Sequence, residues 1–147
     1  MKKRTRGREL ALQFLYQRDL LGAELIEEAG DFLAGEEPDR EARAFAQRLI
    51  GGVHERWDEL DQVIRGVAQN WDIARMAVID RNVLRLATFE LLHCKDIPPK
   101  VTINEAIELG KRFSTANSGA FINGILDRIK SQSEGAAHGA DEGGARA

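Results

Sequence analysis

Five basic residues lie within the first eight positions of the chain, and their type and spacing suit contact with a polyanion. They are Lys2, Lys3, Arg4, Arg6 and Arg8, with no acidic residue among them. An apolar helical pattern that carries Phe14 and Tyr16 follows directly. Lysine and arginine neutralise phosphates, and aromatic rings stack on unpaired bases. The segment predicts a nucleic-acid contact, and a solvated basic terminus is the alternative.

The usual patterns of catalytic, cofactor and metal sites are missing. The sequence has no glycine-rich phosphate loop and no HExxH motif. His93 and Cys94 are adjacent on an expected helix and so point to different faces, which is poor geometry for a shared metal or a nucleophile pair. We therefore expect no enzymatic activity, no cofactor and no metal site.

Composition narrows the class of protein further. The 147 residues are 43% hydrophobic and 31% charged, which is typical of one soluble domain. The net charge is −3, so any attraction to nucleic acid must be local. No apolar run approaches the roughly 18–20 residues that span a bilayer. The basic N-terminus is not followed by the uninterrupted apolar stretch of a signal peptide. We expect a cytoplasmic protein without a membrane partner.

Hydrophobic spacing predicts an all-α domain of about seven helices that position these side chains. The expected helical segments are 5–21, a short acidic helix within 24–37, 38–53, 57–67, a short turn at 74–76, 80–91, 102–112 and, after a polar loop at 114–119, 121–129. Gly51-Gly52 indicates close packing of the third segment against a neighbour. Residues 131–147 hold no large apolar side chain, so we expect a disordered, glycine-rich tail.

Local signals assign ordinary structural roles to several polar residues. Thr102 and Glu105 have the spacing of a capping box. Asp80 suits the start of a helix, Asn117 suits a turn, and Phe121 fits a buried face. The acidic stretch 24–37 would repel phosphate, so nucleic acid should bind on another side. Spacing alone gives these residues no part in binding.

Six segments, taken in order, resemble the NusB family of transcription antitermination factors. They are RELALQFLYQ at 8–17, NW at 70–71, IDRNVLRLA at 79–87, FEL at 89–91, PKVTINEAIEL at 99–109 and FINGILD at 121–127. The resemblance covers residues 4–130. It implies two packed helical subdomains and no catalysis. It also implies binding of single-stranded boxA RNA from ribosomal RNA operons, as a heterodimer with the ribosomal protein NusE.

The resemblance also implies a role for particular residues. The arm at 1–8, with Lys2, Lys3, Arg4, Arg6 and Arg8, would grip the RNA backbone. Gln13 and Tyr16 would face the RNA, while Asp80, Phe113, Asn117 and Phe121 would line the neighbouring part of the site. Among these, Asp80 would accept a hydrogen bond from a base. NusE would bind the C-terminal helical subdomain, and the complex would join elongating RNA polymerase with other Nus factors.

Other interpretations remain open alongside this one. The chain departs from the family pattern at Ala120, where relatives often carry a basic residue. A NusB-like domain also precedes some RNA cytosine methyltransferases, but no SAM-binding domain follows within these 147 residues. A helical protein–protein adaptor or a homodimer with an incidental basic arm is the main alternative. If five phosphates are neutralised, log affinity should fall with log salt at a slope of roughly −3.5.

Overall fold

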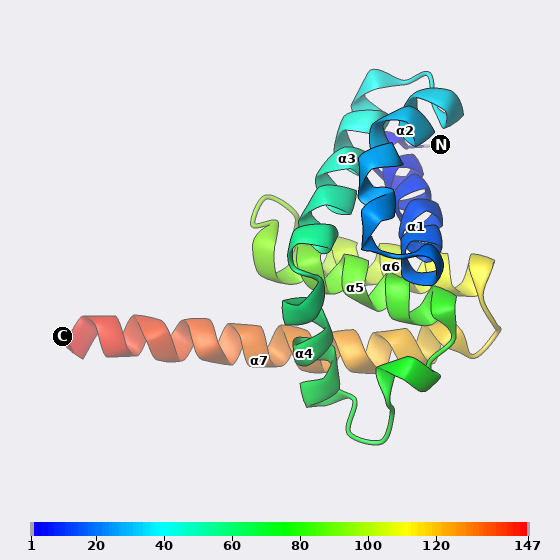
Figure 1. Ribbon diagram of the computed structural model, residues 1–147. Helices are drawn as coiled ribbons and strands as arrows, with labels where there is room; N and C mark the ends of the chain where they lie inside the picture. The colour runs from blue at the N-terminus through cyan, green and yellow to red at the C-terminus, as the bar shows by residue number, and fades with distance from the viewer. Residues whose placement is uncertain (1, 147) are drawn as a thin grey trace.

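The computed structural model describes the backbone of residues 2–146 and the side chains of residues 2–135. Seven α-helices and two short 3₁₀ helices form this part of the chain, which contains no strand (Figure 1). In chain order they are α1 (Lys3–Leu21), η1 (Ala23–Glu28), α2 (Ala29–Glu36), α3 (Arg40–Glu55), α4 (Trp57–Val67), η2 (Ile73–Arg75), α5 (Val78–His93), α6 (Pro99–Phe113) and α7 (Ser118–Arg146). The prediction of an all-α fold with about seven helices is confirmed.

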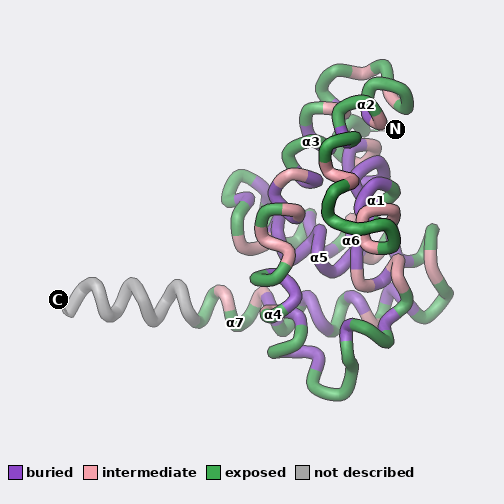
Figure 2. The backbone as a smooth tube through the Cα atoms, in the orientation of Figure 1, coloured by how far each residue is buried: buried purple, intermediate pink, exposed green. Residues whose placement is uncertain are grey.

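Helix α5 lies at the centre of the molecule, and most of the others pack against it. It contacts α1, α3, α4, α6 and α7. Ten of its sixteen residues are buried, and Figure 2 shows this burial along much of its length. Figure 1 shows α1, α2 and α3 stacked at one end of the molecule, with α4, α6 and α7 gathered around α5. Side chains from several other helices therefore lie close to α5.

Three predicted helix boundaries have the expected physical causes. Gly22 ends α1 with a φ of 113°, a conformation that residues with a Cβ avoid. Asp39 caps α3, because its side chain accepts from the Ala42 N–H at 2.9 Å. Asp72 caps η2 in the same way, accepting from the Ala74 N–H at 3.2 Å. Gly22 thus fixes where α1 ends, and the two aspartates fix where α3 and η2 begin.

The predicted capping box at Thr102 and Glu105 is wrong. Helix α6 begins three residues earlier, at Pro99, because proline at the first helical position loses no intrahelical hydrogen bond. The Thr102 hydroxyl instead donates to Glu90 at 2.8 Å, and Glu105 accepts from the Thr5 hydroxyl at 2.8 Å. Both side chains join α6 to other helices rather than closing its first turn.

Two glycines allow helices to approach closely. A Cβ on Gly52 of α3 would overlap the Phe89 ring of α5, so the close packing predicted at Gly51-Gly52 is confirmed for the second glycine. A Cβ on Gly7 of α1 would lie 2.9 Å from the ring of Phe45 in α3. Gly7 therefore belongs to a helix contact and does not merely interrupt a basic arm.

Asp19, near the end of α1, ties that helix to α5. Its Oδ2 accepts from Arg81 Nε at 2.6 Å, from Asn82 Nδ2 at 2.9 Å and from Arg85 Nη1 at 2.9 Å. Burial on its own raises the pKa of the Asp19 carboxyl, but these three donors outweigh it and hold the pKa below the ordinary value of 3.8. The charged form of Asp19 is therefore favoured by folding.

An Asp19→Asn variant is expected to lose part of the acid sensitivity of unfolding. Because the folded-state pKa is lowered, the carboxylate's contribution is complete above pH 3.8 and is lost as the pH falls through the folded-state value. Urea unfolding from about pH 5 to about pH 2 measures the difference. Asp58→Asn, at an exposed aspartate of α4, is the matched control. Equal acid sensitivity in Asp19→Asn and the control would contradict the assignment.

The backbone of α7 continues through most of the segment expected to be a disordered tail, as far as Arg146. Residues 131–135 continue α7 as helix, and Lys130 and Glu134 form an (i, i+4) ion pair at 4.0 Å that supports this turn. Residue 147 and the side chains of 136–146 lie outside the described residues, so disorder there stays a prediction. No helix within residues 2–146 combines the length and apolar character needed to cross a membrane.

Candidate nucleic-acid interface

Two adjoining hollows flank the first turn of α5, and together they contain the side chains expected to face RNA. We call them the Tyr16 hollow and the Asp80 hollow. The Tyr16 hollow, about 460 Å³, is lined by Arg6, Glu9, Leu12, Gln13, Tyr16, Gln17, Ile79, Arg112 and Phe113. The Asp80 hollow, about 270 Å³, is lined by Trp71, Arg75, Met76, Ala77, Asp80, Thr115, Asn117, Ser118 and Phe121. Ile79 and Asp80 are consecutive residues, so the two hollows meet at the start of α5.

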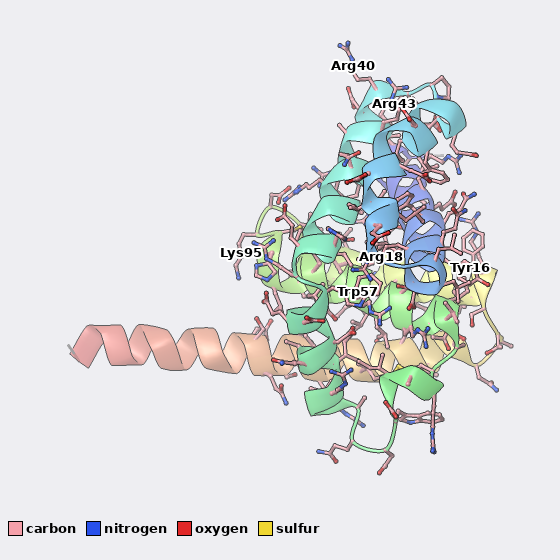
Figure 3. All side chains as sticks on the ribbon, in the orientation of Figure 1. Tyr16, Arg18, Arg40, Arg43, Trp57 and Lys95 are labelled. Carbon is pink, nitrogen blue, oxygen red and sulfur yellow. The ribbon has the colours of Figure 1, made fainter. Side chains whose placement is uncertain are left out.

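The Tyr16 hollow is built where α1 faces α6. Gln13 and Tyr16 are three residues apart on α1 and so share its exposed face, while Phe14 and Leu15 between them are buried. Phe113 is the last residue of α6 and is 44% exposed. Figure 3 shows Tyr16 pointing outward on this side of the molecule. The structure thus brings Gln13 and Tyr16 together as expected, and it places Phe113 beside them rather than in the Asp80 hollow.

The Asp80 hollow joins the start of α5 to the start of α7. Asn117 is exposed in the loop before α7, and Phe121 lies one turn inside that helix. The loop is held by Ser118, whose hydroxyl accepts from the Thr115 backbone N–H at 3.2 Å. Asp80, Asn117 and Phe121 therefore line a single surface, although the chain separates Asp80 from the other two by more than thirty residues.

One carboxylate oxygen of Asp80 accepts no hydrogen bond from the described residues. It is the third residue of α5, inside the first turn rather than at the cap, which is Ala77. The side chain is 9% exposed, and its Oδ1 is buried with no hydrogen-bond partner among the described residues. A buried acceptor left unpaired costs about 1–3 kcal/mol. Asp80 lines the hollow, and an N–H donor that reached Oδ1 from there would remove this cost.

Aromatic rings border both hollows, and the most exposed of them was not among the residues expected to contact RNA. Trp71 is 56% exposed, and its ring meets the ring of Phe121 edge-on at 5.2 Å. Tyr16 is 37% exposed. In the sequence, Trp71 belongs to the NW motif of the family resemblance, but no part in binding was expected of it. A large aromatic residue between Asn70 and Asp72, outside any helical pattern, is the signal that identifies it.

Arg8 does not belong to this surface. It is 3% exposed, with its Nε 2.9 Å from Glu90 Oε2 and its Nη2 2.8 Å from Glu90 Oε1. A guanidinium that is buried and paired in two places cannot reach a phosphate in solvent. The phosphate contact expected for Arg8 is incompatible with this position, and the residue instead joins α1 to α5.

The other basic residues near the N-terminus remain at the surface, mostly beside carboxylates. Lys2 is exposed and precedes α1. The remaining ion pairs are Lys3–Asp39, Lys3–Glu41, Arg4–Asp96, Arg6–Glu9 and Arg6–Glu37, at 3.1–3.6 Å. The pairs of Lys3 and Arg4 are open to solvent and weak, so a phosphate can replace those carboxylates, whereas Arg6 pairs with carboxylates that are largely buried. Glu37 shows that the acidic stretch 24–37 reaches the basic segment instead of lying wholly apart from it.

Cations outside the N-terminal segment also line the hollows, and the sequence did not single them out. Arg112 pairs with Glu9 and lies over the Phe113 ring, 4.9 Å from its centroid. Arg75, in η2, is exposed at the Asp80 hollow. A further hollow of about 420 Å³, which includes Lys3, shares Arg6 and Glu9 with the Tyr16 hollow. Cations therefore occur along the whole surface, where they alternate with the carboxylates of Glu9, Glu37, Asp39 and Asp80.

The described side chains show no arrangement suited to a metal. No three histidine, cysteine, aspartate or glutamate residues within residues 2–135 gather at metal-binding distances. His93 Nε2 lies 2.9 Å from Glu59 Oε1 in an exposed pair. Cys94 is buried, and burial raises the pKa of its thiol, which disfavours the reactive thiolate. The geometry supports binding by charge, hydrogen bonds and stacking.

Comparison with known proteins finds one family along nearly the whole chain. A model of the NusB family matches residues 5–131. The chain is 51% identical over 132 residues to the transcription antitermination protein NusB of Geobacter sulfurreducens, an alignment that covers 89% of this chain and 96% of that protein. It is 50% identical over 135 residues to the NusB of Myxococcus xanthus, with coverage of 88% and 95%.

Solved structures agree with the sequence comparisons. The chain resembles T. maritima NusB with a TM-score of 0.79 and 43% identity, over 87% of this chain and 90% of that one. It also resembles a crystal structure of antitermination factors NusB and NusE in complex with dsRNA. That match has a TM-score of 0.76 and 27% identity, and it covers 90% of this chain and 98% of the other.

Proposed function

Because the chain belongs to the NusB family of transcription antitermination proteins, which are not enzymes, we propose that its two hollows bind single-stranded boxA RNA of ribosomal RNA operon transcripts. The protein acts in the cytoplasm as a heterodimer with NusE. The pair joins elongating RNA polymerase with other Nus factors and suppresses termination. The complex of NusB, NusE and RNA formed by a structural neighbour supports the partnership.

The observation that carries this proposal is the unpaired Oδ1 of Asp80 beside exposed aromatic rings. A carboxylate repels phosphate, but it accepts a hydrogen bond from the amino or imino group of a base. Bases present those groups when they are unpaired and splayed out, as in single-stranded RNA. Asn117 lines the same hollow and offers both a donor and an acceptor. Asp80 and Asn117 thus read bases, while Tyr16, Trp71 and Phe121 stack on them.

Salt titration tests the proposal. Four cations line the three hollows described above, namely Lys3, Arg6, Arg75 and Arg112. If each neutralises one phosphate of single-stranded RNA, log affinity should fall with log salt at a slope of roughly −2.8. This is shallower than a five-residue basic arm would give, because only Lys3 and Arg6 of that arm line the hollows, and Arg75 and Arg112 add two cations. A slope near zero would contradict electrostatic binding of RNA at this surface.

Replacing Trp71 by alanine is expected to weaken binding of single-stranded RNAs of any sequence. Loss of one stacked base costs about 1–3 kcal/mol, or roughly a 5- to 150-fold increase in Kd. The Trp71 side chain is 56% exposed, so the fold should tolerate its removal. Trp71→Phe retains an aromatic face and should recover most of the affinity. Equal affinity of Trp71→Ala and wild type would exclude stacking at this residue.

One observation favours a second candidate, a helical protein–protein adaptor or homodimer. Leu20 and Leu21 at the end of α1 are 54% and 73% exposed, which is unusual for adjacent leucines. A pull-down with purified NusE, with and without boxA RNA at two salt concentrations, separates the two functions. RNA that is retained on NusE only when this protein is present, and is released as the salt concentration rises, supports antitermination. NusE binding without any retained RNA supports the adaptor.

A further inference from the structure

A hollow between α4 and α7 continues the surface beyond the Asp80 hollow. It measures about 260 Å³ and shares Trp71 and Phe121 with the Asp80 hollow. Its other lining residues are Ala68, Gln69, Asn70, Ala120, Gly124, Ile125 and Arg128. We call it the Arg128 hollow. The two hollows share an aromatic wall, so a chain stacked on these rings has a path into both.

The Arg128 hollow offers the groups that single-stranded RNA needs. Arg128 is exposed, and its Nη1 donates to the Val67 carbonyl at the end of α4 at 3.0 Å, which holds the guanidinium in place. A guanidinium has five N–H donors, so others remain for a phosphate. Gln69 and Asn70 are exposed amides that can donate to and accept from base edges. Phosphate contacts, base contacts and a stacking face thus occur together.

The dimensions and charges also limit how far the RNA could extend. Phe121 and Arg128 are seven residues apart on α7, which is about 10 Å along the helix axis. Nucleotides stacked at about 3.4 Å cover this distance in about three steps. Asp127 and Arg128 both line the next hollow, of about 310 Å³, so a carboxylate accompanies the guanidinium there. The opposed charges make that hollow less attractive to phosphate than the Arg128 hollow.

We propose that single-stranded RNA runs from the Asp80 hollow past Trp71 and Phe121 into the Arg128 hollow, where Arg128 contacts a phosphate. This extension rests on the proposed function, because it requires RNA in the Asp80 hollow. It adds a binding site for about three nucleotides that flank the core element. The contact contributes affinity without requiring a particular flanking sequence.

The test compares a short boxA-type single-stranded RNA with the same RNA extended by about three nucleotides at its 5′ or its 3′ end. Wild type is expected to gain affinity with one extension, and the salt slope should steepen by about 0.7 for one added phosphate contact. Arg128→Gln should bind the short RNA as wild type does, yet lose the added slope and up to about fivefold in affinity for the extended RNA. Arg128→Lys should retain the slope.

Arg65→Gln removes a charge from α4 outside the hollows and is the matched control. Circular dichroism verifies that each variant keeps its helices. If added nucleotides give no gain in affinity at either end of the RNA, or if the added salt slope survives in Arg128→Gln, the proposed Arg128 site alone is overturned. A protein segment in this hollow would give the first of these results. Failure of wild type to bind the short RNA would instead overturn the proposed function and the extension together.

Discussion

Replacing Glu90 by alanine is expected to destabilise the protein by about 3–5 kcal/mol, the cost of removing one partner from a buried ion pair. Arg8 and Glu90 are 3% and 2% exposed and are joined by two hydrogen bonds of 2.9 and 2.8 Å. Without Glu90, the nearest remaining carboxylate oxygen is Glu105 Oε1, 3.8 Å from Arg8 Nη1. The Thr102 hydroxyl also loses its acceptor.

Equilibrium unfolding in urea measures this loss. Asp96→Ala provides the control, because Asp96 pairs with Arg48 and Arg4 at the surface, and its removal should change the free energy of unfolding far less. Apolar replacement of both buried partners, as in Arg8→Met with Glu90→Leu, should recover part of the stability by removing the unpaired charge. Losses of equal size in Glu90→Ala and Asp96→Ala would contradict a structural role for Arg8.

The burial of Arg8 changes how the basic segment must be tested. Alanine at Arg8 would weaken RNA binding by disturbing the contact between α1 and α5, whether or not Arg8 meets RNA. Arg6→Ala and Lys3→Ala are cleaner tests, since both side chains line hollows and are far more exposed than Arg8. Each should reduce the salt slope by about 0.7 without changing sequence preference.

The sequence predicted most of the fold because helices follow from local patterns. Apolar residues at three- and four-residue spacing and breaks at Gly22 and Asp72 predict the order of the elements. The ordered motifs of the family resemblance also predicted that Asp80, Asn117 and Phe121 would line one site, and the structure places them in one hollow. Periodicity alone would have left these three residues without a role.

Local sequence patterns could not predict the hydrogen bonds and ion pairs between residues far apart in the chain. Arg8 is one of five similar basic residues, and the feature that distinguishes it is Glu90, 82 positions away. Thr102 and Glu105 match a capping box, but their side chains meet Glu90 and Thr5 once the helices pack. The cationic lining from Arg75 and Arg112 likewise depends on where η2 and the end of α6 lie. Tertiary contacts decide each of these roles.

Replacing Asp80 by alanine is expected to change which RNA sequences are preferred, more than it changes average affinity. The carboxylate accepts from one base donor, and a hydrogen bond to a charged group contributes about 1.5–3 kcal/mol. That energy, roughly 10- to 150-fold in Kd, is available only to RNAs that present an amino or imino group at this position. RNAs without it leave Oδ1 unpaired as in the free protein.

The most direct measurement is therefore the affinity of wild type and Asp80→Ala for a set of boxA-type single-stranded RNAs, each with one base changed. Asp58→Ala, at an exposed aspartate outside the hollows, is the control. Wild type and the control should discriminate strongly at one position of the RNA, and Asp80→Ala should lose discrimination at that position alone. Unchanged discrimination in Asp80→Ala would contradict base recognition in the Asp80 hollow.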